Sequence, residues 1–147
     1  MLILPGLLSS CGNKAGHTEI GTTEDTVIDT LPNDFVVFFD RFHADSAFQM
    51  EHINFPLEGL PAYTGVEDTL LNERFFWQKS NWVKHNRFTD PGGNFEHWYL
   101  VANDRIIEHW IKMKGTNLHM KRRFAKLDDG WYLIYYQGLR PTDPENQ

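Results

Sequence analysis

Apolar residues follow a helical period most strongly between Asp34 and Leu57. Four phenylalanines there stand at i, i+3, i+4 and i+7, the spacing that places side chains on one face of a helix. They are Phe35, Phe38, Phe39 and Phe42. Burial of such rings contributes roughly 1.5–3 kcal/mol each before conformational entropy is subtracted. The pattern therefore predicts a helix whose aromatic face forms the centre of the core.

The pattern changes directly after this helix. Ser46 and Gln49 have the spacing of a capping box, which predicts a second, short helix. Residues 53–57 then alternate between apolar and other side chains, as in a half-buried strand. Pro56 has no N–H to donate, so we expect this strand to lie at a sheet edge or to end there. The first part of the chain is thus predicted to be a long helix, a short helix and a strand.

Turn residues interrupt the middle of the chain. Glycine and proline break it at 59–65. Short strands are predicted at 76–80 and 86–88, with Trp82 in the bend between them. The sequence Asp-Pro-Gly-Gly-Asn at 90–94 is a strong loop signal.

The second half of the chain has a regular strand pattern. The turns between its strands contain Asn-Asp, Gly-Thr-Asn and Asp-Asp-Gly, which favour hairpins because such residues accept positive φ. This predicts an antiparallel meander of four strands at 95–102, 106–114, 118–127 and 131–136.

Alternation assigns a face to each side chain of the meander. The core-facing residues are predicted to be Ile107, His109, Ile111, Met113, Leu118, Met120 and Phe124. The solvent-facing residues are predicted to be Glu108, Lys112, Lys121 and Arg123, with Arg122 turned inward or snorkelling. Helices followed by such a bent antiparallel sheet predict an α+β cone.

Length and charge restrict the function. A chain of 147 residues suits one core. Its formal charge of −6 disfavours nucleic acid as the main partner, because phosphate neutralisation needs a basic face. It also disfavours purely electrostatic docking to anionic lipid. The single cysteine, Cys11, excludes a disulfide within the chain.

The first residues carry a processing signal. A short apolar run, residues 2–8, is followed by Leu8-Ser9-Ser10-Cys11. This resembles the bacterial lipoprotein signal, in which the cysteine is acylated and becomes the new N-terminus. The alternative is an ordinary thiol on a poorly ordered end. By the same resemblance, Gly12 after the cysteine implies an outer-membrane anchor with the domain facing the periplasm.

These signals divide the chain into four parts. Residues 1–11 are predicted to be the lipoprotein signal segment and 12–32 a flexible tether. Residues 33–138 form the α+β domain, and 139–147 form a polar tail.

Two motifs connect the domain to a known family. They are FF-x-x-F-x-x-D-x-x-F-Q at 38–49 and I-x-F-P-L at 53–57, and the meander closes on DDGWYLIYY. With these features the chain resembles a family of uncharacterised lipoproteins from Gram-negative gut bacteria, classed as a domain of unknown function. The resemblance covers residues 33–138. It implies a nuclear transport factor 2-like, cystatin-like fold and an envelope location, and it offers no established active site to transfer.

Histidines and tryptophans are the candidates for a site. His109 lies on the apolar face, as a core histidine with a buried partner or as a group lining a cavity, and the core role is favoured. His97 and His119 are expected to face solvent. Tryptophans could line a pocket for a sugar or a lipid headgroup, or fill the cone. Trp77 and Trp98 join His109 as ligand-binding candidates, and Trp110 on the outer face predicts a homodimer interface.

The sequence contains few signals of metal binding or catalysis. The histidines lack the close spacing of a metal site, so no metal and no cofactor are predicted. No acid pair, phosphate loop or nucleophile motif is found. We expect a non-enzymatic envelope lipoprotein that binds a small ligand or an envelope protein. The alternatives are an isomerase- or dehydratase-style enzyme using His109 and a purely structural dimer. A cavity of about 300 Å³ or more would argue against the structural dimer, and two convergent titratable groups inside it would favour the enzyme.

Overall fold

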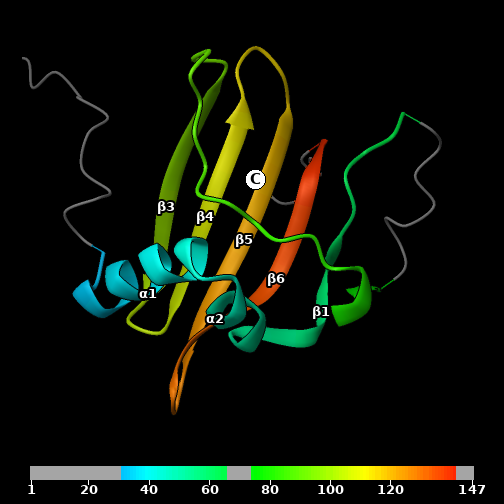
Figure 1. Ribbon diagram of the computed structural model, residues 1–147. Helices are drawn as coiled ribbons and strands as arrows, with labels where there is room; N and C mark the ends of the chain where they lie inside the picture. Colours follow the sequence, from blue (N-terminus) through cyan, green and yellow to red (C-terminus); the bar gives the residue numbers. More distant parts are fainter. Residues whose placement is uncertain (1–30, 66–73, 142–147) are drawn as a thin grey trace, which may run out of the picture.

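A computed structural model describes residues 31–65 and 74–141. Its helices lie on one face of a six-stranded sheet with the strand order β2-β1-β6-β5-β4-β3 (Figure 1). The elements in chain order are α1 (Asn33–Ala44), α2 (Ser46–Glu51), β1 (Ile53–Leu60), β2 (Phe75–Trp77), the 3-10 turn η3 (Lys79–Asn81), β3 (Phe95–Asn103), β4 (Ile106–Met113), β5 (Leu118–Leu127) and β6 (Gly130–Pro141). The predicted α+β cone is confirmed.

Helix α1 forms the core as its pattern predicts. All four phenylalanines of the aromatic face are buried. Phe35 meets the rings of Phe124 on β5 and Trp131 on β6 edge-on, at centroid distances of 5.5 and 5.0 Å. Edge-to-face packing adds about 0.5–1.5 kcal/mol per pair beyond area burial. The helix is therefore fixed across the middle of the sheet.

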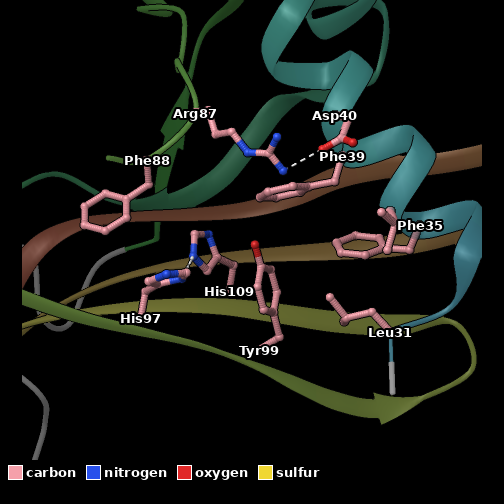
Figure 2. Close-up of a pocket in the computed structure, with 10 residues that line it drawn as sticks. Leu31, Phe35, Phe39, Asp40, Arg87, Phe88, His97, Tyr99 and His109 are labelled. Carbon is pink, nitrogen blue, oxygen red and sulfur yellow. Dashed lines mark hydrogen bonds and ion pairs between the residues drawn. The ribbon is translucent and has the colours of Figure 1, made fainter. Parts of the chain in front are cut away.

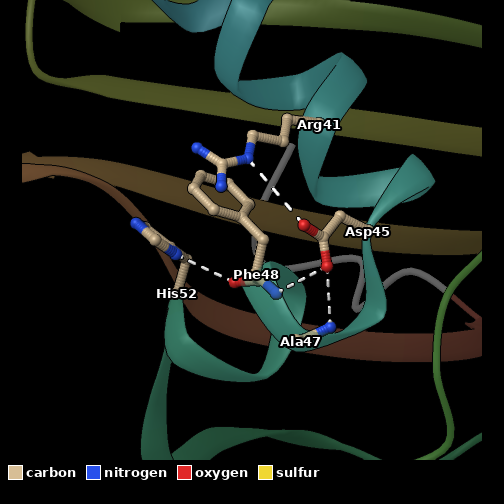
Figure 3. Close-up of polar contacts among 5 residues, drawn as sticks. All are labelled: Arg41, Asp45, Ala47, Phe48 and His52. Carbon is tan, nitrogen blue, oxygen red and sulfur yellow. Dashed lines mark hydrogen bonds and ion pairs between the residues drawn. The ribbon is translucent and has the colours of Figure 1, made fainter.

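The junction of the two helices differs from the predicted capping box. Asp45, not Ser46, caps α2: its carboxylate accepts hydrogen bonds from the N–H groups of Ala47 and Phe48 at 3.0 and 3.1 Å (Figure 3). Arg41 lies over the Phe48 ring at 4.0 Å and approaches the same carboxylate. Asp45 has extended φ and ψ, so α1 ends there and the chain turns into α2.

Strand β1 corrects two predictions. It pairs antiparallel with β2 and parallel with β6, so the sheet is mixed and β1 is not an edge strand. Pro56 follows a cis peptide bond and lies in the irregular stretch between the paired residues Ile53 and Glu58. A proline can stand within a strand at such an irregularity, because no ladder hydrogen bond is required of it. A Cβ on Gly59 would lie 1.8 Å from the Tyr136 carbonyl oxygen, so glycine allows β1 to approach β6.

The meander of β3 to β6 is confirmed with small shifts in the strand ends. Strand β6 continues to Pro141, so residues 139–141 belong to the sheet and not to the predicted tail. Leu31, placed in the predicted tether, packs against the core. The lipoprotein signal with Cys11 and the tether residues 12–30 lie outside the described residues. None of the described helices is long and apolar enough to span a bilayer.

The segment between η3 and β3 crosses the sheet on the same side as the helices (Figure 1). We call residues 82–94 the crossing segment. No strand forms at 86–88, which corrects the prediction, and only Phe75–Trp77 of the neighbouring region pairs as β2. Gln49 is 1% exposed and fixes this segment to the helices. Its amide donates to the carbonyls of Phe42 and His85 and accepts from the His85 N–H, all within 2.9 Å.

Candidate functional site

A cavity of about 200 Å³ lies between α1, the crossing segment and strands β3 and β4 (Figure 2). We call it the inner cavity. It is smaller than the 300 Å³ of a typical ligand pocket. Its lining combines aromatic and aliphatic side chains with imidazoles, a phenol and one ion pair: Leu31, Phe35, Val36, Phe39, Asp40, Arg87, Phe88, His97, Tyr99 and His109.

The aromatic wall follows from the register of the strands. Tyr99 and His109 are Cα partners on β3 and β4, and their rings stack at 4.6 Å with an interplanar angle of 14°. Phe39 from α1 meets both rings edge-on at 5.6 and 5.7 Å. Figure 2 shows the Tyr99 hydroxyl directed toward Phe39 and away from the strand. No hydrogen bond to this hydroxyl is found among residues 31–65 and 74–141, so it is available to a ligand.

A solvent-exposed ion pair forms part of the lining of the inner cavity. The Arg87 guanidinium lies 2.6 Å from the Asp40 carboxylate (Figure 2). Both side chains are more than half exposed. Solvent-exposed pairs contribute little to stability, so this contact can open at small cost.

Arg122 on β5 connects two histidines beneath the cavity. It is 3% exposed. Its NH1 donates to His43 Nε2 at 2.8 Å and its NH2 donates to His109 Nδ1 at 2.9 Å. Among the ion pairs of the described residues, none involves Arg122. A buried cation thus has neutral acceptors and no carboxylate.

These hydrogen bonds determine the tautomers. Arginine only donates, so His109 Nδ1 must accept and its proton stands on Nε2. His109 Nε2 lies 3.4 Å from His97 Nδ1, a long hydrogen bond directed toward the cavity rim. His43 Nδ1 donates to the Phe39 carbonyl at 2.7 Å, which leaves its Nε2 to accept from Arg122. Arg122 is therefore the branch point of two hydrogen-bonded paths: one runs through His43 to a backbone carbonyl, and the other runs through His109 to His97.

Burial and the arginine charge lower the pKa of His43 and of His109 and keep both rings neutral. Desolvation, with Arg122 as the next cause, lowers the pKa of His109 to about 2. Desolvation also lowers the pKa of His43 to about 4, partly opposed by its bond to the Phe39 carbonyl. Burial raises the pKa of Tyr99. At neutral pH His109 and Tyr99 are therefore uncharged, and the charges in the cavity lining are those of the Asp40–Arg87 pair.

The three predicted ligand-binding residues do not converge. His109 lines the inner cavity. The Trp77 indole donates to the Tyr136 carbonyl at 3.1 Å, beside β6 and away from the cavity. Trp98 lies on the outer face of the sheet, where its ring is parallel to that of Trp110 at 6.0 Å. His97 was expected only to face solvent, yet it lines the cavity while remaining exposed.

Side chains on the outer face of the sheet contact one another more than predicted. Glu108 is 7% exposed, not solvated, and its carboxylate accepts from Trp110 Nε1 at 2.8 Å and from Arg123 Nε at 2.7 Å. Lys121 lies over the Trp110 ring at 4.8 Å. Trp110 is half-buried by these neighbours within one chain.

Sequence reasoning missed Tyr99, Arg87 and the role of Arg122. Arg122 shares the inward alternation of Met120 and Phe124, so a charged residue in an apolar stripe was the available signal. Tyr99 and Arg87 gave no such signal, because their places depend on the crossing segment and on register. Within the described ranges no group of three or more metal-binding side chains is found.

Comparison with known proteins identifies the fold. No protein-family model and no curated protein sequence match the chain. A nuclear transport factor 2-like protein from Bacteroides fragilis NCTC 9343 aligns with a TM-score of 0.50 and 19% identity, over 74% of this chain and 47% of that one. The chain thus spans about half the length of that protein. A cystatin-like protein from Bacteroides caccae ATCC 43185 aligns with a TM-score of 0.52 and 20% identity, over 74% and 77% of the two chains. The protein therefore has the nuclear transport factor 2-like, cystatin-like α+β fold.

Proposed function

We propose that the domain is a binding module for a small, largely apolar ligand with one hydrogen-bonding end. The observation that carries this proposal is the inner cavity, whose aromatic walls surround the unpaired Tyr99 hydroxyl. Binding sites combine apolar walls with a few placed polar groups in this way. An apolar cavity of about 150 Å³ holds benzene, so about 200 Å³ suits a single-ring compound.

The test uses acetophenone, which has one ring and one carbonyl acceptor. We expect NMR shifts in wild-type protein at Phe39, Tyr99 and His109. Tyr99→Phe removes one neutral hydrogen bond, worth about 1 kcal/mol, and should weaken binding about fivefold. Tyr132→Phe is the matched control, because that hydroxyl bonds Asp129 on the surface. No shifts at millimolar acetophenone, or shifts confined to the outer face, would contradict the proposal.

Proton transfer at the same cavity is the second candidate function. The observation that favours it is the convergence of two imidazoles, His97 and His109, beside Tyr99. The predicted acid–base group, His109, has a pKa of about 2, donates through Nε2 and is poorly suited to accept a proton. His97 would take that role, with His109 as a positioning residue.

The same probe separates the two functions. A base in the cavity would remove a proton from the acetophenone methyl carbon, giving the enolate, and a deuteron from D₂O would replace it. Deuteration faster than in buffer, and lost in His97→Gln, would favour the enzyme. Deuteration at the buffer rate together with saturable binding would favour the binding module.

We further infer that the domain is held at the bacterial envelope, at the outer membrane facing the periplasm, by lipid on Cys11. The support is the sequence Leu8-Ser9-Ser10-Cys11. Stable anchoring takes more than one acyl chain, which such processing supplies. Cys11→Ser should move the protein from the membrane fraction to the soluble fraction. Continued membrane partitioning of Cys11→Ser would contradict the anchor.

A further inference from the structure

A second cavity of about 190 Å³ lies beside the inner cavity, under the crossing segment. We call it the Arg122 cavity. Its lining is basic and apolar: Lys84, His85, Asn86, Phe88, Ile111, Met120 and Arg122. No aspartate or glutamate is among these lining residues. The lining of this cavity therefore contains two cationic side chains and no carboxylate.

Arg122 is the unusual member of this lining. Burial of a charge without a partner of opposite charge is costly. Two of its five N–H groups are donated to the neutral rings of His43 and His109. Its Nε is buried and has no hydrogen-bond partner among residues 31–65 and 74–141. Native structures rarely leave a buried polar atom unsatisfied, so an unpartnered N–H on a side chain that lines a cavity points to a missing partner.

The remaining lining defines that partner. Guanidinium groups bind carboxylate and phosphate oxygens with strong, charge-assisted hydrogen bonds. Phe88, Ile111 and Met120 provide an apolar wall, which suits a short hydrocarbon body and not a fully solvated inorganic ion. The exposed Lys84 supplies a second positive charge to the site.

We propose that Arg122 and Lys84 form the anion end of a second site, which binds a small carboxylate with a short apolar body. The anion supplies the missing counter-charge to Arg122, and the hydrocarbon body fills the space beside Ile111 and Met120. This site is separate from that of the inner cavity, and its occupation does not require the ligand proposed there.

The experiment titrates the full chain with sodium butyrate against sodium chloride at equal ionic strength. We expect butyrate to raise the thermal unfolding midpoint and to shift the Arg122 Nε–H NMR resonance in a saturable way. 1-Butanol, which has the same carbon chain without the charge, should do neither. Acetate lacks two methylenes and should bind about tenfold more weakly. Phosphate binding more tightly than butyrate would overturn the carboxylate assignment.

Variants locate the site. Lys84→Gln should weaken butyrate binding about fivefold, while Lys79→Gln, an equal charge change on η3 outside the lining, should not change it. Arg122→Met should abolish binding. If Arg122→Met does not fold, Lys84→Gln and the Nε–H resonance decide the result. Arg87→Gln tests the other cavity: loss of butyrate binding in Arg87→Gln but not in Lys84→Gln would place the anion in the inner cavity and overturn the proposal. Equal effects of Lys84→Gln and Lys79→Gln would also overturn it.

Discussion

Two adjacent arginines on β5, Arg122 and Arg123, have different electrostatic surroundings because they lie on opposite faces of the sheet. Arg123 on the outer face pairs with Glu108 at 2.6 Å and lies near the Tyr135 ring. Arg122 on the inner face is almost fully buried and has imidazoles in place of a carboxylate. The arginine on the outer face is neutralised by a carboxylate of the same chain, and the described residues provide no such carboxylate for the arginine on the inner face. A site that needs an external partner is therefore expected inside the cone.

The largest effect is expected from acid, which should lower the free energy of unfolding by protonating the histidines of the inner face. Burial, with the Arg122 charge as the next cause, lowers the pKa of His85 to about 3 and of His109 to about 2. Both values lie below the 6.5 of an unfolded histidine, so the unfolded chain binds more protons, and stability falls as pH drops below about 6.5. Each ring removes up to about 1.4 kcal/mol per pH unit. His43, whose pKa burial lowers to about 4, adds a third ring, so we expect the urea unfolding free energy to fall by about 5 kcal/mol between pH 7 and pH 5.

A pair of variants assigns this pH dependence to the inner face. His85→Phe keeps a ring that cannot be protonated and should remove about a third of the loss. His119→Phe, on the outer face, should leave the loss as in wild type. An unchanged loss in His85→Phe would show that the inner imidazoles do not govern it.

A substitution of Gln49 tests whether attachment of the crossing segment to the helices stabilises the inner face. Gln49→Met removes three short hydrogen bonds and leaves the buried backbone groups of Phe42 and His85 unpaired. We expect a loss of about 3 kcal/mol in urea unfolding. Gln137→Met is the control, since that side chain makes only longer bonds of 3.3 and 3.5 Å on the outer side. Equal losses in both variants would contradict the special role of Gln49.

A substitution of Glu108 tests how much the ion pair on the outer face contributes to stability. Glu108→Gln removes the counter-charge of Arg123 while keeping the volume of the side chain. Because Arg123 is partly exposed, we expect a loss of only about 1–2 kcal/mol. Glu96→Gln, an exposed outer-face substitution on β3, should change the stability by less than about 0.5 kcal/mol. Chemical unfolding followed by tryptophan fluorescence measures both.

The smallest effect on the fold is expected from the predicted homodimer interface. Trp98 and Trp110 lie parallel on the outer face, and aromatic surfaces of this kind suit interfaces. We propose that two copies pair there. Trp110→Ala should then shift size-exclusion elution from dimer to monomer at low micromolar concentration. Identical elution of Trp110→Ala and wild type would contradict this interface.

The elements with local signals were predictable. The phenylalanine period defined α1, and alternation with Asp-Gly and Asn-Asp turns defined the meander of β3 to β6. The parallel pairing of β1 with β6 was not predictable, because it joins segments about eighty residues apart. Pro56 even argued against a central strand, and an irregular stretch of ladder accommodates it.

Residues of the site were predictable only where a polar side chain interrupts a run of alternating apolar residues. His109 and Arg122 each place a polar side chain in an apolar stripe, and both are central to the inner network. Trp77 and Trp98 are ligand-binding candidates by residue type alone, and they lie apart from His109. Tyr99 and Arg87 depend on register and on the crossing segment, which no local period encodes.

Phe88 is a wall of both cavities. Protein interiors have little spare volume, so a rotation of this ring that widens one compartment narrows the other. A ligand in one cavity would consequently weaken the binding of a ligand in the other through the shared Phe88 ring, although neither ligand contacts the other's polar groups. Antagonism of that kind requires no change in the sheet, only one benzyl side chain with two rotamers.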